Sequence, residues 1–164
     1  MTDNRNQPNV AVFLDIDGCV SPLPRQNPYR FDIDEQYNYE MVQPMVPVCD
    51  HVADWLTGPH PGATLVWSSS WGTKAMGITR SLGGGPQQTV FDTPLGPVPN
   101  KPAAITAWCA RNPGVDTVVI VDDDYFETNR VGPRSLRLTP NPYRGLTPVD
   151  LEIIDDFIAS NAMD

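Results

Sequence analysis

The stretch VAVFLDIDG at residues 10–18 constrains this chain most, because it joins a hydrophobic run directly to two closely spaced carboxylates. Asp15 follows the run, and Asp17 comes after one isoleucine with Gly18 behind it. A short apolar run that ends at a glycine is typical of a buried strand. Strand alternation would point both aspartates the same way, and carboxylates this close destabilise each other unless a cation or a proton intervenes. The stretch therefore predicts a buried strand that ends at a cation site.

Two further apolar runs lead into polar clusters in the same way. ATLVWSSSW, at 63–71, runs into three serines, and DTVVIVDDD, at 116–124, ends in three aspartates. Helical patterns separate the runs, and strands that alternate with helices predict a parallel sheet covered on both faces. Ligands of such sheets bind beyond the carboxyl ends of the strands. We therefore expect the acidic pair, the serines and the aspartate triplet to meet there.

Hydrophobic spacing and turn residues predict the remaining elements. The segment 20–40 has no clear periodicity, and we interpret it as a flap because it is too short for a full cap domain. The other expected elements are helices over about 48–57, 73–82 and 101–110, the last capped by Asn100, short strands in QTVFDT and SLRLT, and a final helix from Thr147-Pro148. Together they predict one domain over 1–164, with a doubly wound, Rossmann-like α/β core of three layers and about five parallel strands.

The net charge of −9 over 164 residues disfavours binding to a long nucleic-acid backbone, which needs clustered lysines and arginines. It suits a chain whose acidic residues gather around a cation. No apolar run reaches the length of a membrane span, and the polar start MTDNRNQPN lacks the layout of a signal peptide. We therefore expect a cytoplasmic protein with no membrane association.

Any bound metal is expected to be a hard cation with oxygen ligands. Cys19, Cys49 and Cys109 are scattered without a CxxC pair, so we interpret them as buried small side chains and not as disulfides or zinc ligands. Two histidines are too few for a histidine-built site. Mg²⁺ suits the acidic pair, because it takes one to three carboxylates and keeps its other positions for water and a substrate phosphate.

Two carboxylates beside Mg²⁺ can divide the work of phosphoryl transfer. One can attack phosphorus and form an aspartyl phosphate, while the other gives a proton to the leaving oxygen and later takes one from water. A serine of the 68–70 cluster and the ammonium of Lys101 can bind the phosphoryl oxygens. Lys101 stands near the start of its predicted helix, where the helix dipole disfavours a cation, so its position hints at a ligand.

These features, in this order, resemble the four motifs of the haloacid dehalogenase (HAD) superfamily of phosphotransferases. The residues that carry the resemblance are LDIDG after the first strand, a serine after the second, Lys101 before a helix, and the late IVDDD. The resemblance covers about residues 10–160, and LDIDG and IVDDD are specific in combination. WSSSW, with GLT before the last helix, is also similar to small phosphatase domains of bacterial and phage RNA-repair proteins.

The resemblance implies roles for the first two motifs. Asp15 would be the nucleophile and Asp17 the general acid and base, and both would ligate Mg²⁺, Asp17 through its backbone carbonyl. Ser69 would donate to the phosphate, because it stands two residues before Trp71, as the threonine does in the related W-x-T-x-W pattern. Ser68 is the alternative, because a strict reading of four apolar residues and then a serine ends there.

The resemblance also implies roles for the last two motifs. Lys101 would bind the phosphoryl group and the nucleophile. Asp123 would be the direct metal ligand with Asp122 in support, the reverse assignment being left open, and Asp124 is expected to face away. The implied phosphate contacts, taken together, are Ser69, Lys101, Gly18 and Ser70.

The implied activity is hydrolysis of a phosphomonoester with Mg²⁺ as cofactor. A small phosphorylated substrate, a 5′-nucleotide, is expected because the site is open and aromatic side chains could stack on a base. Those aromatic residues are Tyr29, Phe31, Tyr37, Tyr39 and Trp71. The alternatives are a polynucleotide end, a sugar or metabolite phosphate, and a non-catalytic module that binds a phosphorylated ligand. An open site can also be closed by a second subunit of a homo-oligomer.

Overall fold

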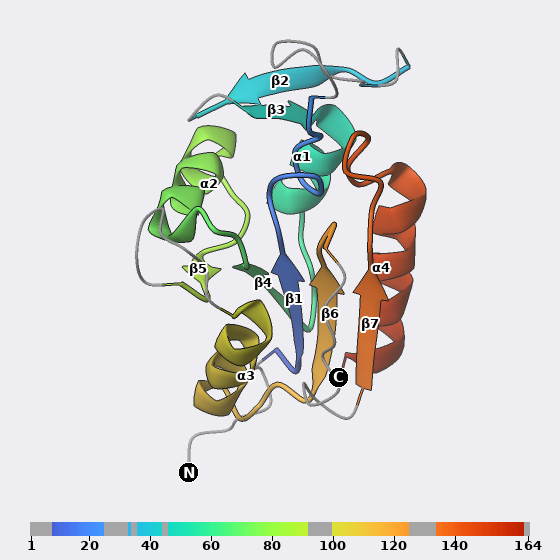
Figure 1. Ribbon diagram of the computed structural model, residues 1–164. Helices are drawn as coiled ribbons and strands as arrows, with labels where there is room; N and C mark the ends of the chain where they lie inside the picture. The colour runs from blue at the N-terminus through green and yellow to red at the C-terminus, as the bar shows by residue number, and fades with distance from the viewer. Residues whose placement is uncertain are drawn as a thin grey trace.

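The sheet at the centre of the computed structural model is the predicted parallel one. The structure describes residues 8–24, 33, 36–43, 46–91, 100–124 and 134–162. In these residues five strands, all paired in parallel, take the order β5-β4-β1-β6-β7, with helices on both faces (Figure 1). Their bounds are β1 Val10–Leu14, β4 Ala63–Trp67, β5 Gln88–Thr89, β6 Thr117–Val121 and β7 Arg134–Leu138. The doubly wound α/β prediction is confirmed.

Strand β1 lies in the middle of the sheet, and its side chains belong to two hydrophobic cores. One core joins Leu14 to helices on one face. These helices are α1 (Asp50–Thr57), α2 (Met76–Leu82) and α4 (Pro148–Asn161). The other core joins Phe13 to α3 (Lys101–Arg111), where Phe13 and Trp108 meet edge to face with ring centroids 5.3 Å apart. Because β1 is buried on both faces, its sequence is continuously apolar and does not alternate.

The two predicted helix caps, at Asn100 and Thr147, are present. Asn100 caps α3 by accepting a hydrogen bond from the backbone N of Ala103 at 3.0 Å. Thr147 forms a capping box with Asp150 at the start of α4, and a 3₁₀ turn, Gly72–Ala75, leads into α2. Among the helices that the structure describes, none has the length and apolar character needed to cross a membrane.

An antiparallel hairpin of β2 (Tyr39–Val42) and β3 (Val46–Cys49) was not predicted. The helix expected from residue 48 begins at Asp50 instead, because Val48 and Cys49 are paired in this hairpin with Glu40 and Tyr39. Figure 1 places the hairpin beyond the carboxyl ends of the sheet strands. The predicted flap at 20–40 lies mostly outside the described residues, which include only 20–24, 33 and 36–40 of it.

Two neighbouring isoleucines of α4 test this packing. Ile154 is fully buried in the larger core, whereas Ile153 is 41% exposed. We expect Ile154→Ala to lower the free energy of unfolding by about 2–5 kcal/mol and Ile153→Ala by less than about 1 kcal/mol, because only the first leaves a cavity. Urea unfolding of both variants measures the difference. Equal losses would contradict the described orientation of α4.

Candidate functional site

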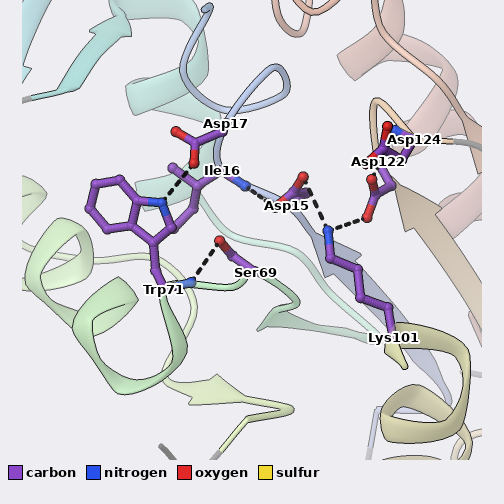
Figure 2. Close-up of polar contacts among 8 residues, drawn as sticks. All are labelled: Asp15, Ile16, Asp17, Ser69, Trp71, Lys101, Asp122 and Asp124. Carbon is purple, nitrogen blue, oxygen red and sulfur yellow. Dashed lines mark hydrogen bonds and ion pairs between the residues drawn. The ribbon is translucent and has the colours of Figure 1, made fainter. Parts of the chain in front are cut away.

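Three central strands end at the same level and bring the predicted site residues together. The last residues of β1, β4 and β6 are paired in register. The next residues, Asp15, Ser68 and Asp122, therefore stand next to one another at the carboxyl edge of the sheet. Figure 2 shows Lys101, from the first turn of α3, pointing between Asp15 and Asp122.

The ammonium of Lys101 is shared by two carboxylates. Its Nζ lies 2.6 Å from Oδ2 of Asp122 and 3.2 Å from Oδ2 of Asp15. Burial acts to lower the pKa of Lys101, but the two carboxylates outweigh it and hold this pKa above its usual value. The contacts therefore compensate a charge that the amino end of a helix disfavours.

Asp15 is buried in a way that opposes its ionisation. Its side chain accepts a hydrogen bond from the backbone N of Ile16 at 2.9 Å. Burial is the largest influence and raises the pKa of Asp15 to about 8, against the lowering effect of Lys101 and together with the raising effect of Asp122. Burial also raises the pKa of Asp122, and Lys101 again acts in the opposite direction. One lysine does not compensate these carboxylates fully, so a further cation would be stabilised here.

The carboxylates of Asp15 and Asp123 fit a hard divalent cation. Their oxygens and the sulfur of Cys19 lie within 4.8 Å of one another. Gly18 permits this approach, because its φ is +80° and a Cβ there would lie 2.7 Å from Cγ of Asp123. Burial, followed by the nearby carboxylates, raises the pKa of the Cys19 thiol, which leaves oxygens as the charged donors. Such a donor set suits a cation such as Mg²⁺.

The three aspartates after β6 have different surroundings. Asp122 is engaged twice, because Oδ1 accepts from the backbone N of Asp124 at 3.0 Å and Oδ2 accepts from Lys101. Asp123, half-buried, is the one grouped with Asp15. Asp124 was expected to face away and is exposed, but one of its carboxylate oxygens lies within 4.8 Å of those of Asp122 and Asp123.

Asp17 has a partner that the sequence did not indicate. Its Oδ2 accepts a hydrogen bond from Nε1 of Trp71 at 2.8 Å, whereas Asp15 contacts Lys101 (Figure 2). Strand β1 ends at Leu14, so the alternation expected to align the two aspartates does not extend to them. The nearest sequence signal is that Trp71 follows the strand next to β1, but an aromatic ring there equally suits stacking on a base.

The serine cluster offers two buried hydroxyls. Ser69 Oγ accepts from the backbone N of Trp71 at 3.3 Å, which leaves its own proton free for a phosphoryl oxygen. Ser68 Oγ is buried with no hydrogen-bond partner among the described residues, and such a group costs about 1–3 kcal/mol unless a ligand or water pairs it. Ser70, by contrast, is exposed.

The aromatic residues expected to stack on a base are only partly described. Tyr29 and Phe31 lie outside the described residues. Tyr37 packs on the ring of His51, with centroids 4.6 Å apart, and Tyr39 is 51% exposed on β2. Tyr39 is therefore the described flap aromatic with the most accessible ring.

Comparison with known protein families connects this geometry to a named group. Residues 11–151 match the family model described as the HAD domain in Swiss Army Knife RNA repair proteins. The matched range contains all the site residues above. Searches of curated proteins and of solved structures gave no match.

The buried Asp15 predicts a pH-dependent stability of the metal-free protein. A carboxyl with a pKa of about 8 when folded and about 4 when unfolded binds more protons in the folded state. Its contribution to stability therefore falls as pH rises from about 4 to about 8, by at most about 1.4 kcal/mol per pH unit. Asp15→Asn removes this contribution, so with EDTA the variant should gain stability relative to wild type across the range. Urea unfolding measures this, and a pH-independent difference would contradict it.

Gly18 and Gly83 form a matched pair for testing the approach of Asp123. Both have left-handed backbone, but a Cβ at Gly83 would meet nothing within 4 Å. We expect Gly18→Ala to weaken Mn²⁺ or Mg²⁺ binding by about 10-fold or more, because the Asp123 carboxylate must move, and Gly83→Ala to leave binding unchanged. Calorimetric titration of both variants measures the dissociation constants. Equal dissociation constants for the two variants would show that the position of the Asp123 carboxylate does not depend on Gly18.

Proposed function

The chain belongs to the family of HAD domains in Swiss Army Knife RNA repair proteins, and on this basis we propose that it is a Mg²⁺-dependent phosphomonoesterase that acts through an aspartyl phosphate. Membership of the family supports a phosphatase-type hydrolase. The single observation that carries the finer proposal is the sharing of Lys101 by Asp15 and Asp122 where three parallel strands end. This arrangement keeps one carboxylate beside a cation and close to buried serine hydroxyls.

The residues divide the reaction as follows. An oxygen of Asp15 attacks phosphorus, the bond from phosphorus to the leaving oxygen breaks, and Asp17 gives that oxygen a proton. Water then attacks the phosphorus of the aspartyl phosphate, the bond from phosphorus to the Asp15 oxygen breaks, and Asp17 takes a proton from this water. Inorganic phosphate leaves, and the Asp15 carboxylate is restored.

The phosphoryl oxygens need donors and positive charge throughout. Ser69 would donate its hydroxyl proton, with Ser68 as the alternative, and Lys101 would neutralise charge on the phosphoryl group. Gly18 and Ser70 complete the proposed phosphate contacts. Asp15 and Asp123 would hold Mg²⁺ with the backbone carbonyl of Asp17, and the ion would supply charge neutralisation for the phosphoryl group. Asp122 would support this set through Lys101.

A nucleotide-like phosphate is the proposed substrate class. The accessible ring of Tyr39 on the hairpin beyond the strand ends supports a base-bearing substrate. The net charge of −9 favours a 5′-nucleotide over a long polynucleotide. The RNA repair proteins that name the family favour instead a phosphorylated RNA end, which we keep as the second candidate.

Phosphate release tests the proposal directly. We expect turnover on one or more of a panel of 5′- and 3′-nucleotides, phosphorylated oligonucleotides and sugar phosphates, with Mg²⁺ and not with EDTA. Asp15→Asn should lower kcat by about 10³-fold or more, because the nucleophile is lost. Asp54→Asn, at an exposed position of α1, is the matched control and should leave kcat unchanged. Turnover that survives Asp15→Asn would exclude the proposed intermediate.

The same assay separates the two substrate candidates. Affinity for an oligonucleotide end should weaken steeply with added salt, whereas KM for a mononucleotide should change little. A well-folded protein that binds phosphorylated ligands but hydrolyses none of the panel would favour a non-catalytic binding module.

A further inference from the structure

Trp71 links two parts of the site at once. Its indole Nε1 donates to Oδ2 of Asp17 at 2.8 Å, and its backbone N donates to Oγ of Ser69 at 3.3 Å. Figure 2 shows both bonds from the same residue, one to the turn after β1 and one to Ser69, just beyond the end of β4. The side chain therefore contacts the proposed proton donor, which no feature of the first motif would indicate.

Backbone hydrogen bonds and core packing both restrain Trp71. The backbone N of Gly72 donates to the carbonyl of Ser69 at 3.1 Å, and that of Lys74 donates to the carbonyl of Trp71 at 3.1 Å. The ring itself is half-buried and packs against the larger core. The backbone bonds place the main chain of Trp71, and the packing of its ring against the core restricts rotation of the indole.

The turn that carries Asp17 is closed by its own hydrogen bonds. The carbonyl of Ile16 accepts from the backbone N of Cys19 at 3.1 Å and from that of Ser21 at 2.9 Å. These bonds place the backbone of Asp17 but leave rotation about its side-chain bonds. An external donor is therefore needed to orient the carboxylate.

We propose that Trp71 is a positioning residue that orients Asp17 for proton transfer to the leaving group. The indole N–H occupies Oδ2 and leaves Oδ1 as the oxygen that would carry the acidic proton to the leaving group. When the leaving oxygen takes this proton, Oδ2 keeps its hydrogen bond and the resulting carboxylate stays in place to activate water. The inference rests on the proposed function and deepens it, because it concerns the orientation of the Asp17 carboxyl group during proton transfer.

Leaving-group chemistry gives a readout specific to this role. A strongly basic leaving oxygen, as in a 5′-nucleotide, needs a proton as its bond to phosphorus breaks, whereas the weakly basic oxygen of p-nitrophenyl phosphate leaves without one. If Asp17 is wrongly oriented, kcat/KM should therefore fall for the 5′-nucleotide and change little for p-nitrophenyl phosphate. A general loss of structure would slow both.

The variant Trp71→Phe keeps an aromatic ring and removes the N–H. We expect kcat/KM to fall by about 10-fold to 100-fold for the 5′-nucleotide and by less than about 3-fold for p-nitrophenyl phosphate. Asp17→Asn should show the same selectivity more strongly. Trp55→Phe is the matched control, since Trp55 Nε1 also donates to a carboxylate at 2.8 Å, that of Asp155 between α1 and α4. This control should leave both rates nearly unchanged.

The outcomes separate the inference from the proposed function. If a folded Trp71→Phe variant loses kcat/KM equally for both substrates, or for neither, the positioning role is overturned. The proposed phosphatase activity is not affected by that result. A wild-type protein that hydrolyses neither substrate would overturn the proposed function and the inference with it. If Trp71→Phe does not fold, a second measurement takes its place. The NMR resonance of the Trp71 indole N–H is then compared between wild type and Asp17→Ala. An unchanged resonance in Asp17→Ala would overturn the inference, and a shift that spares the Trp55 resonance supports it.

Discussion

The pair of contacts from Lys101 to Asp15 and Asp122 is the interaction on which the site depends. Parallel register brings these carboxylates to one edge of the sheet, where burial alone would favour their protonated forms. A lysine in the first turn of α3 compensates part of this charge and ties the helix to the two central strands. The carboxylates that remain, with Asp123 against Gly18, then make a second, exchangeable cation favourable.

Several parts of the site lower stability locally, and two extensive cores offset them. Three features would each be unfavourable in a chain selected only for folding: the Ser68 hydroxyl, which has no partner within the part of the chain that the structure describes, the left-handed backbone of Gly18, and the buried carboxylate of Asp15. They occur together at one strand edge, whereas the apolar residues of β1 are buried on both faces. This concentration is what a binding site for an anion and a cation requires.

Local signals were enough to predict the sheet, the helix caps and the convergence of Asp15 and Asp122. Each depends on short-range patterns, namely continuous apolar runs, an Asn or Thr before a helix, and aspartates directly after a strand. The hydrogen bond between Trp71 and Asp17 could not be predicted, because it joins residues 54 positions apart beyond the regular end of β1. The β2–β3 hairpin was missed because Val48 also fitted the hydrophobic spacing of α1.

The central claim is that Asp15 carries the phosphoryl group during turnover. The measurement that tests it most directly is acid quenching in the steady state with a ³²P-labelled substrate, followed by peptide mapping of the labelled protein. The account predicts a label on Asp15 that is stable in acid and released by hydroxylamine, as an acyl phosphate is. Turnover without any covalent label, or a label on another residue, would contradict it.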